Sequence, residues 1–289
     1  KGGANYRAND NSNFFFNVGQ IMRPPSFDGV FPNADYDFEE ADEILNESFT
    51  SFELGYGFRS SNFKGTINAY HTVWGDRTLR RSTSIDDQGV RIIYSGVEQT
   101  HQGIEGEMTW YPSNRLRIKG MFSLGDWKYT KNFQGDAYFI DNNQPAGTTG
   151  TLYLDGVKIG DAAQTVFYLG FDYKLSSKLS VDLDMMRYDN LHGRFGPLDS
   201  EFNSDNNRGS IKLPSWGTAD LGATYSFNLL GYDARARLNV NNLFDEEYLS
   251  QSQTNFHNDG GRTWNGVNVE NNVYFGKGTT WNLGLNIRF

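Results

Sequence analysis

The sequence has no cysteine and only 7 prolines among its 289 residues. The absence of cysteine fits an envelope protein that does not depend on disulfides, but many cytosolic proteins also lack cysteine. No run of about 18 apolar residues is present, which excludes a protein that crosses a membrane with helices. The mean hydropathy of −0.61 is low. It does not exclude a membrane β-barrel, because only every second residue of each strand faces lipid.

A basic surface is also missing. The net charge is −9 and the isoelectric point is near 5.0. Lysine and arginine form no basic stripe along the sequence. Nucleic-acid binding depends on a clustered basic face that neutralises phosphates. The sequence therefore argues against a nucleic-acid partner.

Metal sites and catalytic sites have little support. The histidines form no i, i+4 pair and no H-x-x-E-H pattern, and there is no G-x-S-x-G motif. The scattered histidines are His71, His101, His192 and His257. The acidic stretch 35–43 could bind a divalent cation, but it lacks the spacing and turn glycine of a calcium loop, so we interpret it as a solvated loop. We expect no catalytic residue, no metal and no cofactor. An outer-membrane lipase or protease would need a Ser/His or Asp/His set whose members are distant in the sequence and meet only in the folded chain.

The sequence is rich in aromatic residues, at 15%, and in glycine, with 32 residues. This composition suits many strands joined by turns. The C-terminal segment 280–289 alternates strictly, with Trp281, Leu283, Leu285, Ile287 and Phe289 on one face and polar residues or glycine on the other. A terminal strand of this kind is typical of outer-membrane β-barrels.

Short and long connections alternate along the chain. Short polar turns are predicted at 59–62, 112–115, 176–178 and 228–231, whereas the other connections are much longer, at about 21–48, 75–99, 131–162, 189–215 and 245–279. Loops beyond about 12–15 residues are uncommon in compact soluble domains. Short turns on one side and long loops on the other are typical of bacterial barrels.

Between these turns we expect ten antiparallel strands of roughly the length that a tilted strand needs to cross a bilayer. They are 13–20, 49–59, 62–74, 100–111, 115–129, 163–174, 178–188, 216–227, 232–244 and 280–289. One face of each is apolar and the other carries charges such as Glu105, Lys119 and Asp184. The predicted fold is all-β, a transmembrane antiparallel β-barrel, although a soluble sandwich could show the same alternation.

The positions of the aromatic residues favour the membrane barrel. A row on the apolar face at the short-turn end fits an interfacial girdle with a role in assembly: Tyr56, Phe58, Trp110, Tyr173, Tyr225, Phe227 and Phe289. At the long-loop end Trp281 and Phe167 keep the same alternation, but Trp74, Trp127 and Trp216 do not. Either a bulge or an early strand end would explain these three tryptophans.

Four short motifs carry a family resemblance. They are Asn239-Val-Asn-Asn-Leu-Phe-Asp-Glu-Glu-Tyr248 near the end of the chain, Gly103-Ile-Glu105 leading to Trp110-Tyr-Pro112, Arg23-Pro-Pro-Ser-Phe27, and Glu53-Leu-Gly-Tyr56. In their order and spacing they resemble the N-L-F-D-x-x-Y, G-x-E, R-x-P-x-F and E-L-G-Y segments of TonB-dependent receptors of the bacterial outer membrane. The loop chemistry and the Asn/Gly-rich style look like Bacteroidetes receptors.

The resemblance implies a barrel of about 22 strands that is plugged by an N-terminal domain. Residues 1–289 would be the C-terminal portion of that barrel, with the plug domain and the N-terminal strands absent and residues 1–7 left as a stub. The start of the chain reads as the tail of a strand rather than as a signal peptide, so we expect a fragment. Contact with the TonB complex would be made through the absent N-terminal part. Glycan-importing members usually have a threonine-rich sequence where this chain has Asp245-Glu-Glu-Tyr248, which makes a glycan substrate less expected.

Two long loops mix cations with aromatic side chains, a combination that suits an anionic or aromatic ligand such as a ferric siderophore. The candidate ligand-binding residues are Arg80, Arg81, Arg91 and Tyr94 in one loop and His257, Arg262 and Trp264 in another. The same groups suit contacts with lipopolysaccharide phosphates or with neighbouring loops. We interpret the charged side chains on the polar face of the strands as a hydrated inner wall of the barrel that packs against the plug.

The leading functional hypothesis is an outer-membrane transporter in a lipid bilayer with lipopolysaccharide, which imports a scarce small nutrient and performs no chemistry on it. The alternative is a glycan or peptide importer that works with a surface lipoprotein on the long loops. A soluble β-rich adhesin or carbohydrate-binding module is the contrasting class, in which the aromatic residues would form a platform instead of a belt.

Overall fold

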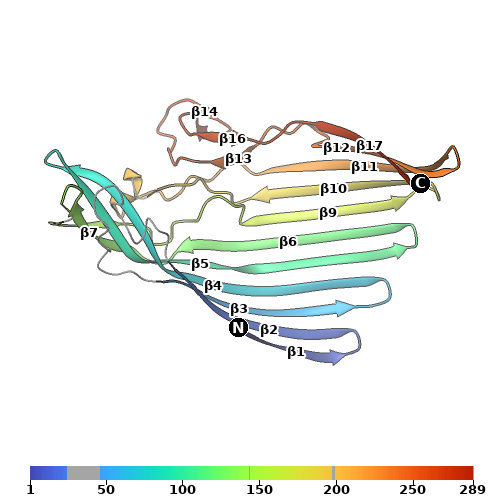
Figure 1. The fold of residues 1–289 in the computed structure, drawn as a ribbon, viewed down its shortest axis with the longest axis horizontal. Coiled ribbons are helices and arrows are strands. Elements are labelled where there is room, and N and C mark those ends of the chain that lie inside the picture. Colours follow the sequence, from blue (N-terminus) through green and yellow to red (C-terminus); the bar gives the residue numbers. More distant parts are fainter. Residues whose placement is uncertain (25–45, 143, 197–198, 289) are drawn as a thin grey trace.

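The computed structural model describes residues 1–24, 46–142, 144–196 and 199–288. In this part of the chain a 13-stranded antiparallel sheet dominates, and eleven of its strands follow one another on a single path (Figure 1). The strands of the path are β1 (Gly2–Asn9), β2 (Ser12–Arg23), β3 (Glu47–Arg59), β4 (Phe63–Ile85), β5 (Gln88–Ser113), β6 (Leu116–Tyr129), β9 (Thr165–Lys174), β10 (Leu179–Asp189), β11 (Trp216–Leu229), β12 (Tyr232–Asn241) and β17 (Thr280–Arg288). Short turns join them at one end and long connections at the other (Figure 1). The all-β, antiparallel class is therefore confirmed.

All ten predicted strands are present, and β1 is an eleventh that the sequence did not reveal. The segment expected to be a stub pairs along its length with β2, for example Tyr6 with Phe14 and Ala4 with Phe16. Its apolar-face positions include Gly2 and Ala4, so it has no hydrophobic stripe by which a strand is recognised. Backbone pairing with the neighbouring strand defines it instead.

The connection expected at 75–99 is not an irregular loop but an extension of the β4–β5 hairpin beyond the rest of the sheet (Figure 1). Ile85 pairs with Gln88, and the two residues between them, Asp86 and Asp87, have φ values of 50° and 64°. These left-handed conformations give the tight two-residue turn that suits the twist of a hairpin. Sequence analysis missed the hairpin because the whole segment was interpreted as one of the long connections between strands.

The other long connections contain short secondary elements of their own. These are β7 (Phe133–Phe139), β8 (Pro145–Leu152), the 3-10 helix η1 (Ser200–Asn203), β13 (Leu249–Ser252), β14 (Thr263–Trp264), β15 (Val267–Asn268) and β16 (Val273–Phe275). β7 pairs with both β5 and β8, so the β4–β5 extension and the β7–β8 hairpin form one continuous sheet. Among the described residues, no helix combines the length and the apolar character needed to cross a bilayer.

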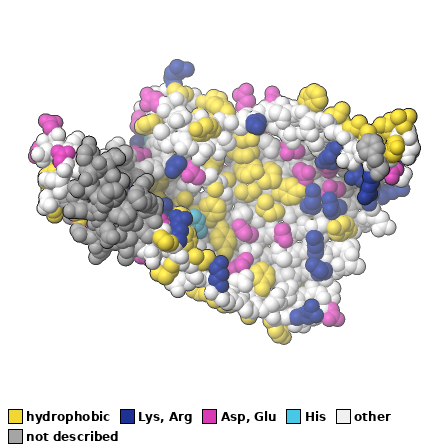
Figure 2. Space-filling model, in the orientation of Figure 1, with side chains coloured by type: hydrophobic (Ala, Val, Ile, Leu, Met, Phe, Trp, Pro, Cys, Tyr) yellow, Lys and Arg dark blue, Asp and Glu magenta, His cyan; other side chains and the backbone are white. Residues whose placement is uncertain are grey.

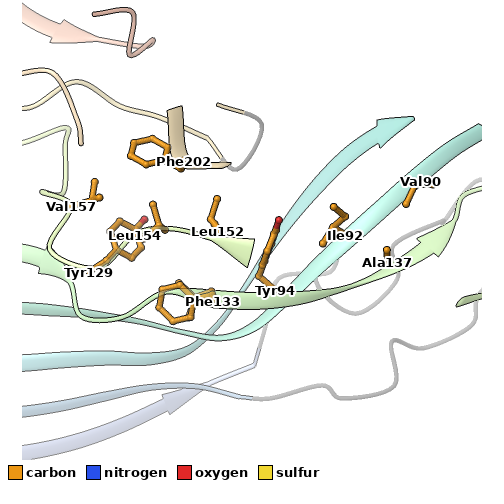
Figure 3. Packing of buried hydrophobic residues seen from close by; sticks show 11 residues of the cluster. Val90, Ile92, Tyr94, Tyr129, Phe133, Ala137, Leu152, Leu154, Val157 and Phe202 are labelled. Carbon is orange, nitrogen blue, oxygen red and sulfur yellow. The ribbon is translucent and has the colours of Figure 1, made fainter. Parts of the chain in front are cut away.

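The buried hydrophobic core lies among these connections rather than against the large sheet. In the main cluster Tyr94 points toward the β7–β8 hairpin, with Phe133 and Leu152 on one side and Ile92 on the other (Figure 3). Phe202 of η1 closes the same cluster and is fully buried. A second cluster joins Leu191, Ile211, Leu213, Leu249 and Val267. The described parts of these connections therefore pack into compact structures.

The large sheet has one continuous apolar face. Its register places Tyr56 beside Ile67 and Phe122 beside Phe167, and the ring of Phe122 covers Gly106, where a Cβ atom would lie 2.4 Å away. The predicted alternation of the last strand is confirmed in its register: Leu285 pairs with Ala236. Along this face, Leu54, Ile104 and Trp281 are between 46% and 72% exposed. We call it the apolar face; the opposite face is the polar face.

The described residues predicted to form an interfacial girdle lie on the apolar face near the short turns, and their role at a membrane interface remains a prediction. Phe58, Trp110, Tyr173 and Tyr225 lie on the apolar face near the short turns and are 38–48% exposed, while Tyr56 and Phe227 are partly buried. Phe289 lies outside the described residues.

Neither explanation offered for Trp74, Trp127 and Trp216 is correct. Each keeps regular pairing, with Phe49, His101 and Tyr188 respectively, and the register shift in β4 begins only after Trp74. All three point to the polar face at the long-loop end. The sequence analysis assumed that an aromatic residue in such a strand belongs to the belt, but these tryptophans line the opposite side.

Candidate functional site

The polar face carries a ladder of ion pairs between neighbouring strands. Arg117 bonds Asp172 at 2.8 Å, and Lys119 lies 3.4 Å from Asp172 and 3.1 Å from Asp184. Farther along the sheet Arg237 contacts Asp182 at 2.8 Å. Figure 2 shows acidic and basic side chains on the sheet face that is turned to the viewer, around a central group of hydrophobic side chains. Such a wall of paired charges is well suited to contact with water or with a polar domain.

Aromatic side chains gather on the polar face where it meets the long connections. The indole Nε1 of Trp127 donates to the hydroxyl of Tyr70 at 2.8 Å, and its ring lies 5.5 Å from that of His101. Gly103 makes room for this arrangement, because a Cβ atom there would lie 2.7 Å from the Tyr70 hydroxyl. Glu53 and Glu105 line the same shallow hollow. The hollow thus combines ring faces with carboxylates.

Trp74 and Trp216 occupy two further aromatic stacks along this rim. Trp74 lies between the guanidinium groups of Arg23, at 5.5 Å, and Arg77, at 3.8 Å. Its indole donates to Glu47, which is also the ion-pair partner of Arg23. Sequence reasoning missed these residues as a functional group because the contact between Arg23 and Glu47 joins separate strands.

The Trp216 ring is sandwiched between two tyrosines, Tyr188 at 4.0 Å and Tyr248 at 3.8 Å. Tyr248 belongs to the motif that carried the family resemblance, and its ring covers Gly276, where a Cβ atom would be 1.9 Å away. The sandwich ties the long connection 242–279 to the end of β11. It gives the last of the three tryptophans a fixed position at the rim.

The first group of predicted ligand residues lies on the β4–β5 extension. Arg80 pairs with Ile93 and Arg81 with Ile92 through the backbone, and the side chain of Arg81 lies outside the described part. Tyr94 is fully buried in the main loop cluster, and Arg91 is 4% exposed. Burial lowers the pKa of the Arg91 guanidinium. Tyr94 and Arg91 therefore belong to the interior of the loop structure, and a ligand role for this group remains a prediction.

The second group lies nearer to the surface. The His257 ring contacts the Gly209 carbonyl oxygen at 2.9 Å, and Arg262 is exposed. Trp264 packs edge-on against Phe275 at 5.2 Å. Tyr94 belongs to the main loop cluster, whereas Trp264 packs against the second cluster, so these members of the two predicted groups lie in different loop structures. The acidic stretch 35–43 falls outside the described residues, and the described ones hold no cluster of potential metal ligands.

Arg208 fastens two of the long connections together. Its guanidinium contacts Glu201 of η1 at 2.8 Å and Asp259 at 2.5 Å, and its backbone N–H donates to Glu201 at 2.6 Å. The hydrogen bond from Arg208 is the largest cause that lowers the pKa of Glu201 to about 2 from its ordinary value of 4.5. Glu201 therefore contributes stability that is complete above pH 4.5 and is lost as the pH falls toward 2.

Acid is expected to release this fastening. Below about pH 4.5 the protection factor of the Arg208 amide against hydrogen exchange should fall, and Glu201→Gln should lower it about tenfold already at neutral pH, since a charge-assisted bond is lost. Asp205→Asn removes an exposed carboxylate from the same connection and is the matched control. An unchanged protection factor in Glu201→Gln would show that the connection is held by other contacts.

The described part of the chain is thus a sheet with one apolar face, one ion-paired face and packed connections at one end. Residues 1–243 match the family model described as TonB dependent receptor-like, beta-barrel. The chain belongs to this family. No curated protein matches the chain.

Solved structures of receptors share the fold. The closed form of the ferric-catecholate import receptor Fiu from E. coli K12 superimposes with a TM-score of 0.63 at 16% identity, covering 99% of this chain and 34% of that one. The siderophore receptor PiuA from Acinetobacter baumannii gives 0.64 at 14% identity, covering 98% and 34%. The unliganded ferric citrate transporter FecA gives 0.63 at 12% identity, covering 98% and 37%. The chain thus spans about a third of the length of these proteins, and at such identities the likeness concerns the fold.

Proposed function

We propose that this chain is the C-terminal part of the β-barrel of an outer-membrane transporter that imports a scarce nutrient such as a ferric siderophore. The observation that carries the proposal is the apolar face, which extends from β1 to β17 in a member of this receptor family and carries charges only toward its long-loop end. A sheet of this kind is stable where lipid covers one face. The long connections lie at one end, where they meet ligand from outside.

The substrate class is supported by the neighbours and by the chemistry of the loop end. Fiu, PiuA and FecA are described as receptors or transporters of ferric catecholates, siderophores and ferric citrate. Ferric chelates of this type are anionic or aromatic, which suits the exposed Arg262 and the stacked tryptophans of the rim. Transport changes no covalent bond of the substrate, and the proposed partners are lipopolysaccharide in the membrane and the TonB complex through a separate N-terminal part. The Asn/Gly-rich composition of the loops supports the proposal that the receptor is Bacteroidetes-like.

The test is uptake by the full-length receptor. In a host that lacks its own siderophore receptors, expression of the receptor should restore TonB-dependent uptake of radioactive iron supplied as a catecholate, a hydroxamate or a citrate complex. Growth on oligosaccharides or peptides, together with co-purification of a lipoprotein, would support the alternative importer instead. A protein that is found in the soluble fraction would contradict both.

Ligand capture by the second predicted group has its own prediction. In the purified receptor, Arg262→Ala is expected to weaken binding of the transported chelate about tenfold, because a charge-assisted hydrogen bond is lost. Quenching of tryptophan fluorescence measures the affinity. Arg59→Ala removes an exposed arginine at the short-turn end and should leave the affinity unchanged. Equal affinities of the two variants would exclude Arg262 from the site.

A further inference from the structure

Charge on the apolar face is confined to one place. Outside the β4–β5 extension, which covers residues 75–99, charged side chains occur at only four of the described strand positions of this face. They are Asp126, Lys128, Arg187 and Asp189. All four lie in the last residues of β6 and β10 at the long-loop end. β9 separates these two strands and begins at Thr165, opposite Leu124 and Asp189, so the β6 charges lie just beyond its first residue.

Two loop lysines add to this group. Lys158 pairs with Lys128 in an isolated β-bridge, and both ammonium groups contact Asp126. On the other side Lys212 contacts Asp189 at 2.9 Å, and the Arg187 charge also acts on Asp189. Each carboxylate therefore faces two cations and neutralises one of them. Lys128, Lys158, Arg187 and Lys212 together keep an excess of positive charge, and we call these four residues the basic cluster.

The two halves of the basic cluster are linked through His192. His192 bridges to Lys212 through the backbone, and its ring contacts Ser210, whose hydroxyl donates to the Lys158 carbonyl oxygen at 2.8 Å. Burial is the largest cause that lowers the pKa of His192, and the charges of Lys158 and Lys212 act in the same direction. The hydrogen bond to the Ser210 backbone and the charge of Asp189 act in the opposite direction. The positive potential of both lysines thus reaches the space between them.

The cations remain accessible despite their ion pairs. The side chains of Lys128, Lys158 and Lys212 are 39%, 38% and 50% exposed, and Arg187 is exposed with one Nη2 contact to Ser215 at 2.5 Å. An ammonium group has three donors, and a carboxylate partner uses only part of them. The basic cluster can therefore bind a further anion without breaking its own pairs.

We propose that the basic cluster binds a phosphate group on the headgroup of a glycolipid in the outer leaflet of the membrane. This inference rests on the proposed function, which places the apolar face in lipid and the long connections outside. On the same face Leu124 lies two residues below Asp126 and Phe167 pairs with Arg187; they are 44% and 46% exposed, and acyl chains would contact the sheet there. A molecule with phosphate above and hydrocarbon below matches both surfaces, whereas a soluble anion matches only the upper one.

Lipid binding to the full-length receptor tests the proposal. The receptor is purified in detergent and titrated with diphosphoryl lipid A, with the same lipid after removal of its phosphates, and with inorganic phosphate. The test variant combines Lys128→Gln with Lys212→Gln, so that Asp126 keeps Lys158 and Asp189 keeps Arg187. The control combines Lys64→Gln with Lys178→Gln, two exposed lysines toward the short-turn end. Heat-modifiable gel mobility verifies that every variant is folded.

Each lysine removed is expected to weaken binding of diphosphoryl lipid A about fivefold, and the test variant about 25-fold, while the control stays within twofold of the wild type. The dephosphorylated lipid should bind the wild type as weakly as the phosphorylated lipid binds the test variant. Equal binding of the test and control variants would overturn the proposal. Displacement of the lipid by inorganic phosphate at similar concentrations would overturn the lipid as the occupant. Nutrient uptake is measured separately. If the receptor imports nutrient normally but the lysine substitutions leave its affinity for lipid A unchanged, only this inference is contradicted.

Discussion

A lysine in place of Leu169 is expected to prevent stable insertion of the full-length receptor. Leu169 lies on the apolar face in the middle of β9, with Gly120 and Met185 beside it on the neighbouring strands. A lysine near the bilayer midplane of a barrel costs about 2–4 kcal/mol when it points to lipid. That is a large fraction of the stability of a typical protein, so the variant should be degraded or remain unfolded.

A matched substitution separates the effect of the face from the effect of the charge. Met121 lies beside Tyr168, the neighbour of Leu169 in β9, but on the polar face, where it pairs with Glu107. Met121→Lys introduces the same charge at nearly the same height, next to a carboxylate. We expect it to insert at close to normal levels. The amounts of folded receptor in outer-membrane fractions, read from heat-modifiable gel mobility, compare the two. Equal amounts would show that the apolar face does not contact lipid.

Residues 1–289 expressed alone are expected to form heterogeneous aggregates rather than a closed monomer. In the described part of the chain β1 pairs only with β2, and β17 only with β12. Each edge therefore presents a row of backbone N–H and C=O groups with no partner strand. In hydrocarbon each such group costs several kcal/mol, and in water an open edge recruits other edges.

Refolding in detergent measures this prediction. The segment should give a broad size distribution, little protease resistance and no heat-modifiable band. The full-length receptor treated in parallel should give a single size, protease resistance and a heat-modifiable band, as a closed barrel does. A discrete, protease-resistant monomer of the segment would show that β1 and β17 can close on each other. It would then follow that the sheet is a complete small barrel.

The fold class could be predicted because apolar and polar residues alternate within most strands according to the face of the sheet that they occupy. Leu179, Val181 and Leu183 occupy every second position of β10, so a face could be assigned without knowing any partner. The same rule failed for β1, whose small residues leave no stripe. For the three rim tryptophans the alternation gave the correct face. The mistake was the assumption that aromatic residues of these strands belong to the apolar face.

The candidate ligand residues show the other limit. The group around Tyr94 was chosen for its residue types, yet Tyr94 and Arg91 are buried, because the β7–β8 hairpin pairs with β5 across a long stretch of sequence. No local pattern records that pairing. The basic cluster has the same origin, since Lys128 at the end of β6 meets Lys158 and Lys212 only when two connections pack beside the sheet.

The sequence by itself determined that the protein is an antiparallel β-sheet with one apolar and one polar face, short turns at one end and long connections at the other. These properties depend on residues close together in the chain, where a period of two and turn chemistry act directly. Only the tertiary structure decided that 75–99 is a hairpin extension, that the connections share a buried core, and where cations and aromatic rings meet. Those outcomes depend on pairing between distant segments, whose register is fixed by packing and by backbone hydrogen bonds that no single segment specifies.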